Sequence, residues 1–309
     1  MDGIINVIKP PGMSSFQVVN YIRRLLKVKK VGHTGTLDPG AAGVLPICVG
    51  KATRIVPYLI EADKTYVAEM TLGISTTSQD AGGETENLDF DVQISPKHLA
   101  DAFSKFLGKI QQIPPMASAV RVDGQRLYEL ERQGITVDRK PRQVVIKEMH
   151  INKIWPEEPY LQFGSRILFE VSCSKGTYVR TLCSNLGKEL GTVAHMSFLV
   201  RTRSGNFQIQ QGFTLEEIEE KVQQRDYSFI LPIEEALPEF PKVTASPYVE
   251  QKIRNGNYVT MDDLISTVKD LTVGDEVLLM NLSGELLALA TIRWKDGLIC
   301  QPTRVLKGV

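Results

Sequence analysis

A glycine-rich segment, residues 32–46, limits the possible folds of this chain more than any other feature. It reads GHTGTLDPGAAGVLP. Its glycines permit positive φ angles and close backbone approach, and its prolines remove hydrogen-bond donors, so we expect a turn-rich region over 32–50 rather than one long helix. The segment carries a single carboxylate, Asp38, in an Asp-Pro-Gly sequence. On local composition alone, Asp38 either takes part in chemistry or bonds its own backbone in a turn.

The familiar glycine-rich and nucleophile motifs do not fit this segment. It lacks the order G-x-x-x-x-G-K-[ST] of a nucleotide phosphate cradle, and it is not G-x-G-x-x-G. The chain also lacks G-x-S-x-G, and Asp38 has no second acid beside it in the sequence, so neither a serine hydrolase nor a glycosidase is indicated.

Cysteine and histidine usage argues against a metal or disulfide framework. The 4 cysteines form no C-x-x-C, and the 4 histidines show no metal-ligand spacing. No apolar run approaches the roughly 18–20 residues of a membrane span. The first residues lack a basic region followed by a long apolar stretch, so a secretory signal is not expected. These features predict a cytoplasmic protein without a metal or a membrane partner.

Hydrophobic periodicity predicts a mixed α/β region over most of the chain. Strands are expected over 3–9, 65–72, 167–173 and 198–203. Helices are expected over 15–26, from Ser95-Pro96 to Gly108, over 178–190 and after Thr214. Residues 75–95 are interpreted as an acidic, polar loop, and residues 121–142 as an exposed element of mixed charge.

The end of the chain has a different pattern. Prolines 238, 241 and 247 suggest a linker over 237–247. Beyond it, strands are expected over 276–280, 286–293 and near 298–305, with a turn at Asn281-Leu282-Ser283-Gly284. We therefore expect one unit over residues 1–235 and a compact β-rich module over 240–309.

Charge is balanced in total but unevenly distributed. The chain has 36 Lys and Arg and 36 Asp and Glu, yet residues 1–60 carry 8 basic and 2 acidic side chains. A local basic surface can form from Arg23, Arg24, Lys27, Lys29, Lys30, Lys51 and Arg54. Solvated charges on the wet face of an amphipathic helix are the simpler alternative for the first of these residues.

Four motifs in order resemble the TruB-type tRNA pseudouridine synthases. Residues 6–15 (NVIKPPGMSS) and 32–46 match the start of that family, Lys64-Thr65-Tyr66 resembles its K-x-Y strand, and residues 174–182 (SKGTYVRTL) resemble its K-G-T-Y-[IV]-R motif. The tail from about residue 240 resembles a PUA module, a small RNA-binding β-barrel. The resemblance spans nearly the whole chain. One departure is Ala42, where the family more often has threonine, and this puts a local hydrogen bond in doubt but not the carboxylate.

The resemblance implies a function and a fold. It implies isomerisation of uridine to pseudouridine in tRNA, at uridine 55 of the T loop, without a cofactor and without an obligate protein partner. The enzyme would flip the uridine out of its stack. The implied fold is an α/β core with a mixed, largely antiparallel sheet, an insertion over about 86–146 that closes over RNA, and a C-terminal PUA-like β-barrel.

The resemblance also assigns the central residues. It makes Asp38 the catalytic carboxylate, whether it attacks the sugar, attacks the base or removes a sugar proton. Arg180 would pair with Asp38 and lower the pKa of its carboxyl group. Tyr66 would place its ring against the uracil and its hydroxyl near C5, although its strand position equally suits the core.

Five further residues are expected to bind the substrate. His33 would lie against the RNA near the flipped nucleotide, unless it is an ordinary loop histidine. Leu199 would form an apolar wall of the uracil pocket and Tyr178 would pack beside Arg180, and both also suit the core. Lys9 and Lys64 would meet phosphates or shape the pocket, unless they are simply solvated.

Two other functions compete with this one. An RNA-binding protein that helps tRNA to fold would need no chemistry, but it has no evident use for the set Asp38, Tyr66 and Arg180. A uridine modifier that uses Cys48 as a nucleophile would need an activating motif, and none surrounds this cysteine. A small buried hydrophobic role suits Cys48 better.

Overall fold

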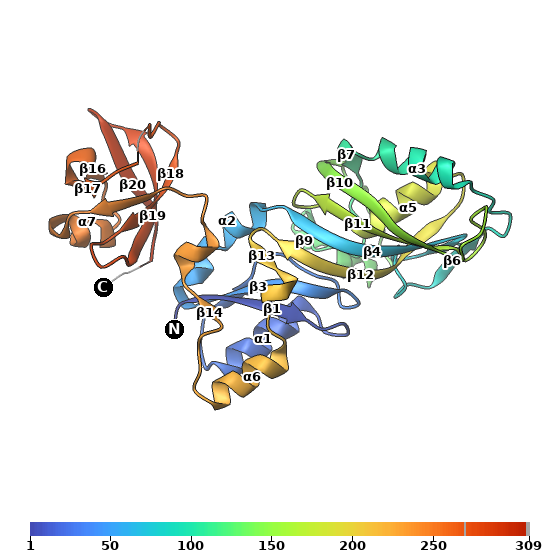
Figure 1. Cartoon of the computed structure of the whole chain (residues 1–309), viewed down its shortest axis with the longest axis horizontal. Coiled ribbons are helices and arrows are strands. Elements are labelled where there is room, and N and C mark those ends of the chain that lie inside the picture. Colours follow the sequence, from blue (N-terminus) through green and yellow to red (C-terminus); the bar gives the residue numbers. More distant parts are fainter. Residues whose placement is uncertain (269, 307–309) are drawn as a thin grey trace.

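The computed structural model describes residues 1–268 and 270–306, and a sheet of 10 strands organises most of the chain before residue 232 (Figure 1). The strands follow the order β14-β1-β3-β12-β4-β11-β10-β7, with β2 beside β3 and β13 beside β12. Only the β12–β3 pair is parallel among the pairings of this described sheet, which confirms the expected mixed, largely antiparallel arrangement.

The strands of this sheet have the following bounds. They are β1 (Gly3–Lys9), β2 (Val31–His33), β3 (Ala42–Val49), β4 (Lys64–Leu72), β7 (Gly108–Gln112), β10 (Arg142–Trp155), β11 (Arg166–Cys173), β12 (Ala194–Ser204), β13 (Phe207–Gln208) and β14 (Ile230–Leu231).

Helices cover one face of the sheet. They are α1 (Ser15–Leu25), α3 (Pro96–Lys105), α5 (Val179–Glu189) and α6 (Leu215–Gln223), and their apolar residues share one core with β1, β3, β4 and β12. The predicted starts are confirmed: Ser14 and Gln17 form a capping box at α1, and Thr214 and Glu217 form one at α6. A 3₁₀ turn, η1 (Gly50–Ile55), and the short α2 (Val56–Glu61) connect β3 to β4.

Alternation in β1 divides the core between the two faces. Ile5 and Val7 point toward the helices, whereas Ile4 belongs to a second apolar cluster on the other face. Leu278 and Leu289 of the C-terminal module are in that second cluster. The module lies beside the sheet and is packed against η1 and α2, where the Tyr58 hydroxyl lies 3.4 Å from the Thr303 hydroxyl (Figure 1).

The segment 32–50 is less irregular than expected. Residues 42–49 form β3, which lies between β1 and β12. Pro46 cannot donate a hydrogen bond, but its carbonyl accepts one from the Thr34 amide at 3.1 Å. Gly43 has φ 107°, and a Cβ atom there would lie 2.2 Å from the Arg201 carbonyl oxygen, so only glycine lets β12 pass this close.

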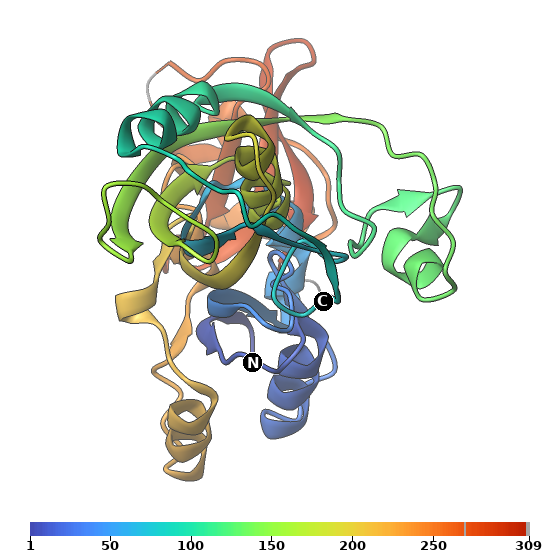
Figure 2. The same ribbon diagram turned by 90° about the vertical axis from the view of Figure 1, so that its right-hand side faces the viewer.

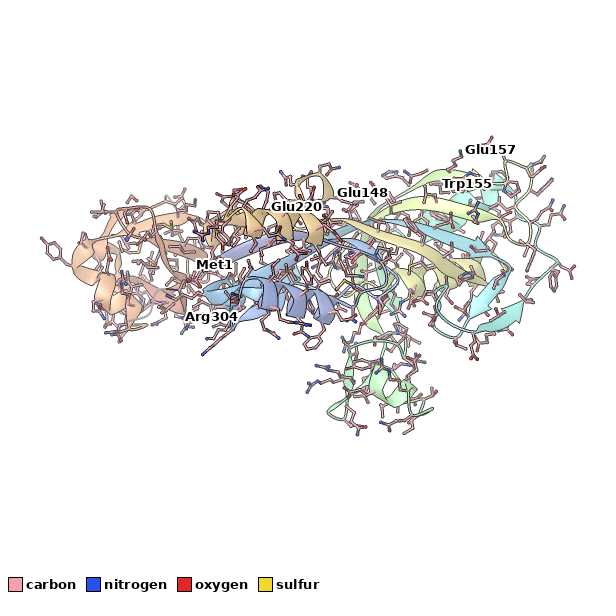
Figure 3. All side chains as sticks on the ribbon, turned by 90° about the horizontal axis from the view of Figure 1, so that it is seen from below. Met1, Glu148, Trp155, Glu157, Glu220 and Arg304 are labelled. Atoms are coloured by element: carbon pink, nitrogen blue, oxygen red, sulfur yellow. The ribbon has the colours of Figure 1, made fainter. Side chains whose placement is uncertain are left out.

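Two excursions leave the sheet between β4 and β10. The predicted acidic loop over 75–95 contains a hairpin, β5 (Ile74–Thr76) and β6 (Thr85–Leu88). Farther on, β8 (Arg121–Val122), β9 (Gln125–Arg126) and α4 (Leu127–Glu131) form a small lobe. This lobe, which lies within residues 113–141, projects away from the rest of the molecule (Figures 2 and 3).

The C-terminal module is a curved sheet of 6 strands in the order β16-β20-β19-β18-β15-β17. Its strands are β15 (Lys242–Ala245), β16 (Val259–Thr260), β17 (Leu264–Ser266), β18 (Glu276–Met280), β19 (Leu286–Trp294) and β20 (Leu298–Val305), with α7 (Glu250–Arg254) packed on it. The linker expected over 237–247 is wrong in part, because it contains β15 and because Leu237 is 1% exposed. No helix in the described ranges is long and apolar enough to cross a membrane.

Candidate active site

Asp38 and Arg180 form an ion pair, although 142 positions separate them in the sequence. Asp38 lies in the loop between β2 and β3, and Arg180 lies in the first turn of α5. The Arg180 Nε atom is 3.0 Å from Asp38 Oδ2, and its second amino nitrogen donates to Asp38 Oδ1 at 3.3 Å. The carboxylate keeps 34% of its side-chain surface exposed, whereas the Arg180 side chain keeps 4%. Arg180 thus fixes the rotamer of a carboxylate that can still reach a substrate.

Arg180 also joins two other segments to this pair. Its guanidinium donates to the Ser78 carbonyl at 3.2 Å and to the Ala117 carbonyl at 2.9 Å. It lies 3.5 Å from the Asp80 carboxylate. The Asp38 loop, the loop after β5 and the base of the 113–141 lobe therefore meet at one buried cation. Sequence reasoning missed Asp80, whose only signal was its place in an acidic loop.

The pKa of the Asp38 carboxyl is raised above its usual value. Burial is the largest cause, and the negative charge of Asp80 adds to it. Arg180 and, more weakly, Lys9 act in the opposite direction and lower this pKa. The predicted effect of Arg180 thus has the correct sign, but burial outweighs the ion pair, so the pKa is raised overall.

The loop around Asp38 is braced from behind. The Ser15 hydroxyl donates to the Leu37 carbonyl at 3.0 Å and accepts from the Leu37 amide at 2.8 Å. The Gly12 amide donates to the Pro39 carbonyl at 2.8 Å. Both residues flanking Asp38 are therefore held to the start of α1, which keeps the carboxylate in place before a substrate arrives.

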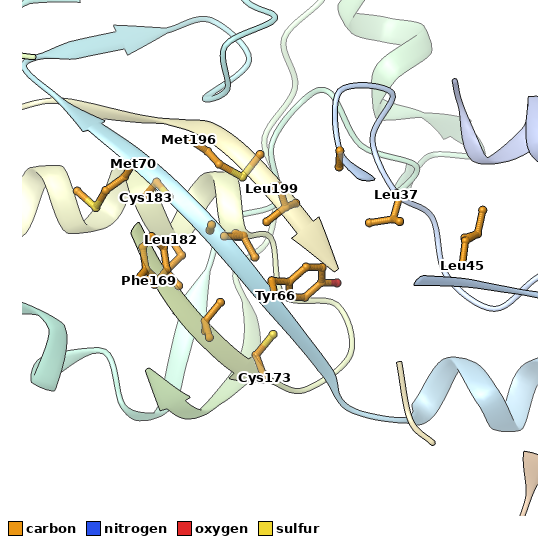
Figure 4. Packing of buried hydrophobic residues seen from close by; sticks show 14 of the residues in the cluster. Leu37, Leu45, Tyr66, Met70, Phe169, Cys173, Leu182, Cys183, Met196 and Leu199 are labelled. Carbon is orange, nitrogen blue, oxygen red and sulfur yellow. The ribbon is translucent and has the colours of Figure 1, made fainter. Parts of the chain in front are cut away.

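Tyr66 and Leu199 lie side by side on β4 and β12. Leu199 is opposite Ala68 in the register, and Arg201 is opposite Tyr66. Both predicted residues belong to the main core, with 9% and 7% of their surfaces exposed (Figure 4). Figure 4 shows the Tyr66 hydroxyl pointing toward the side of the cluster that holds Leu37 and Leu45. The ring is therefore part of the core and also faces the Asp38 loop.

Arg201 is a second buried arginine that the sequence did not reveal. It is 1% exposed, and it donates to the Val44 carbonyl at 2.6 Å and to the Gly35 carbonyl at 3.1 Å. It also interacts with the Tyr66 hydroxyl. Burial raises the pKa of Tyr66 even though Arg201 lowers it, so the phenol is protonated at neutral pH.

Comparison with known proteins identifies the family of this chain. A model of the TruB family pseudouridylate synthase N-terminal domain matches residues 23–179, and a model of the tRNA pseudouridylate synthase B C-terminal domain matches residues 180–238. The first match covers both the Asp38 loop and the Tyr66 strand. This chain belongs to the TruB family of pseudouridylate synthases.

Relatives of this TruB-family chain extend over nearly its whole length. A protein from Moorella thermoacetica named tRNA pseudouridine synthase B is 42% identical over 307 residues, which is 99% of each chain. The protein of the same name from Bacillus subtilis is 44% identical over 291 residues, 94% of this chain and 92% of the other.

Solved structures agree with this assignment. A chain in an H/ACA RNP bound to a substrate RNA containing 2′-deoxyuridine is 27% identical, with a TM-score of 0.74 over 99% of this chain and 85% of that chain. A chain in a Cbf5-Nop10-Gar1 complex has the same TM-score and coverage at 29% identity. The α/β pseudouridine synthase fold with a β-rich C-terminal module is thereby confirmed.

The two lysines expected to bind substrate in this TruB-family site are buried. Lys9 is 0% exposed, and its ammonium donates to the carbonyls of Pro10, Met13 and Pro39. Lys64 is 6% exposed, and its ammonium donates to the carbonyls of Ile60 and Ala62, at the end of α2. Burial lowers the pKa of each to about 8. In this conformation neither ammonium faces solvent, so simple surface solvation is wrong for both.

His33 and Tyr178 lie at the edges of the site. His33 precedes the Asp38 loop, and its Nδ1 atom accepts from the Gly35 amide at 3.2 Å. Burial and the nearby Arg201 lower the pKa of His33, so the ring is neutral at pH 7. Tyr178 is the N-cap residue of α5, and its backbone exchanges two hydrogen bonds with the Gln112 side chain. This anchors the helix that presents Arg180.

The described residues offer no alternative chemistry at Cys48 or at a metal. Cys48 is 0% exposed, and burial raises the pKa of its thiol to about 12. A protonated, buried thiol is a poor nucleophile. Within residues 1–268 and 270–306, no group of three or more His, Cys, Asp or Glu side chains is placed to hold a metal ion.

Proposed function

We propose that this chain isomerises uridine to pseudouridine in tRNA, at uridine 55 of the T loop, with Asp38 as the essential carboxylate. The observation that carries the proposal is the Asp38–Arg180 ion pair, in which the carboxylate keeps 34% of its side-chain surface exposed. The preceding residue, Leu37, shares a core cluster with Tyr66 and Leu199. The names of the TruB-family relatives support tRNA as the substrate class.

The reaction needs an ionised Asp38 and a pocket that is open to the uridine. Because it is an isomerisation, it takes no atom from a second substrate. The N1–C1′ bond breaks, a C5–C1′ bond forms, the C5 proton leaves and N1 gains a proton. Asp38 must be ionised before any of its three possible first steps. Burial raises its pKa, whereas Arg180 and, more weakly, Lys9 act in the direction of the charged form.

Tyr66 and Leu199 form the proposed apolar wall for the uracil. Stacking of a base on an aromatic ring contributes about 1–3 kcal/mol, which helps to offset the few kcal/mol needed to extrude a stacked nucleotide. The protonated Tyr66 hydroxyl is suited to donate a proton rather than to remove one. His33 would lie against the RNA as a neutral ring, and Tyr178 would hold the Arg180 helix in place.

The two lysines would act by shaping the site. Lys9 connects the Pro39 carbonyl to the turn before α1, and Lys64 closes the end of α2. Both thus support the pocket rather than meeting a phosphate directly. This choice between the two expected roles follows from the enclosure of their ammonium groups.

Three parts of the chain would form the RNA-binding surface. The basic segment within residues 23–54 and the lobe within the insertion at about 86–146 belong to the catalytic unit, and the C-terminal module lies beside that unit. We propose residues 1–235 as the catalytic unit and residues 240–309 as a PUA-like RNA-binding unit. A folded tRNA arm is recognised by its shape and by bases splayed from its loop, which suits such a divided grip.

Tritium release tests the activity and its position together. Transfer RNA labelled with tritium at uracil C5 should release label into water when incubated with the protein, and product mapping should place pseudouridine at position 55. A tRNA with cytidine at position 55 should release no label. If that tRNA still releases label, the assigned position is wrong. If no tRNA releases label yet all bind, the protein is an RNA-binding or folding protein.

A further inference from the structure

Helix α1 carries an exposed aromatic ring at the edge of the catalytic loop. Phe16 lies in the first turn and is 64% exposed. Its neighbour Ser15 is buried and makes both hydrogen bonds to Leu37, the residue before Asp38. The position of Phe16 is therefore fixed relative to the catalytic carboxylate through a short, rigid chain of contacts.

The ring lies on the flank of α1 that faces away from α6. Helical spacing places Phe16, Asn20 and Arg23 on one side, which we call the outer flank. On the opposite side, the Tyr21 hydroxyl donates to Glu219 of α6 at 2.7 Å. Figure 2 shows α1 in dark blue with gold α6 to one side, and the green lobe of residues 113–141 projecting on the other side. The outer flank thus looks toward the side on which the lobe stands.

The outer flank is basic and lacks carboxylates. Helix α1 contains no acidic residue, and the Arg23 guanidinium donates only to the Asn20 amide oxygen, at 2.6 Å. Among ion pairs of the described residues, none involves Arg23, Arg24 or Lys27. Unpaired cations next to an exposed aromatic ring suit a polyanion with accessible bases. An acidic protein surface could pair with these cations, but its carboxylates would not cover the exposed Phe16 ring.

We propose that Phe16 stacks on an unpaired nucleobase next to the uridine that enters the site. The ligand class is a single-stranded loop nucleotide, because bases within a duplex are already stacked on each other. The backbone of the same loop would run along Arg23 and Lys27. The inference rests on the proposed function and deepens it, because a second clamped base would fix which loop nucleotide reaches Asp38.

Binding measurements on surface variants test the role of the ring. The probe is a T stem-loop hairpin that contains the target uridine, bound to the full chain. Phe16→Ala should raise Kd about tenfold, which is 1.4 kcal/mol and within the range for a stacked base. Phe16→Tyr, which keeps a ring, should stay within about twofold of the parent. The control is Tyr160→Ala, which removes an aromatic ring that is 47% exposed, and it should leave Kd unchanged.

Abasic hairpins identify the partner base. Removal of one base beside the target uridine should weaken binding to the parent about tenfold and to Phe16→Ala by less than about twofold, because the lost contact is the same. The inference is overturned if Phe16→Ala binds like the parent, or if every abasic hairpin weakens both proteins equally. Neither result affects the proposed function, which fails only if the parent forms no pseudouridine in tRNA.

Discussion

The two buried arginines of the site, Arg180 and Arg201, are almost equally enclosed but have opposite surroundings. Arg180 is 3% exposed and contacts two carboxylates, those of Asp38 and Asp80. Arg201 is 1% exposed and contacts two carbonyls and the Tyr66 hydroxyl, with no ion pair to any described residue. Arg180 holds the carboxylate of Asp38, whereas Arg201 holds the loop backbone on both sides of it.

The different partners indicate different roles: Arg180 orients the Asp38 carboxylate, whereas Arg201 supports the backbone of the loop. Gly35 and Val44, the partners of Arg201, lie on either side of Asp38 in the sequence. Loss of Arg201 should therefore act on stability first, and loss of Arg180 should act on turnover first. Three substitutions test whether the two arginines differ in this way.

Arg180→Met should have the largest effect on turnover. It removes the fixed donors that orient the Asp38 carboxylate, and one such donor in an active site is typically worth about 10²–10³-fold in rate. Because Arg180 lowers the Asp38 pKa, its loss should also move the acidic limb of the rate profile to higher pH. Single-turnover rates measured from pH 5 to pH 9 test both effects. A large rate loss with an unmoved limb would assign Arg180 to positioning alone.

Arg201→Met should mainly lower stability. It leaves the buried carbonyls of Gly35 and Val44 without their donor, and each unsatisfied group costs about 1–3 kcal/mol. Urea unfolding of this variant and of Arg180→Met provides the comparison. Equal stability of Arg201→Met and the parent would show that the loop does not depend on this cation.

Asp80→Asn should have the smallest and most specific effect. The negative charge of Asp80 raises the Asp38 pKa, so its removal should move the acidic limb to lower pH, opposite to Arg180→Met. The amide keeps the size of the side chain, and a rate loss below about tenfold is expected from one weakened surface-side contact. The pH dependence of the single-turnover rate decides the sign. A shift to higher pH would mean that Asp80 acts mainly by orienting Arg180.

Local signals allowed much of the fold to be predicted. The capping boxes at Ser14 and Thr214 and the alternation in β4 depend on neighbouring residues, so they were readable from the sequence. Strand β3 was hidden in a glycine-rich segment, because Gly43 serves close packing against β12 rather than a turn. The strand within the predicted linker, β15, depends on its pairing with β17 and β18, which are distant in the sequence.

Only those site residues that belong to a recognisable sequence motif could be predicted. Asp38 and Arg180 came from the family resemblance, and the structure brings them together. Asp80 and Arg201 were missed because their importance arises from contacts across a hundred positions or more. Lys9 and Lys64 were judged by residue type, which favours the surface, whereas backbone carbonyls enclose both ammonium groups.

Asp38→Asn is the most stringent test of the proposal that the Asp38 carboxylate is essential for the chemistry. The amide has nearly the same shape but cannot carry a negative charge, so it separates chemistry from binding. We expect this variant to bind tRNA with a Kd close to that of the parent and to form no pseudouridine in a single turnover. Pseudouridine formation at a rate near that of the parent would contradict the assignment of the chemistry to this carboxylate.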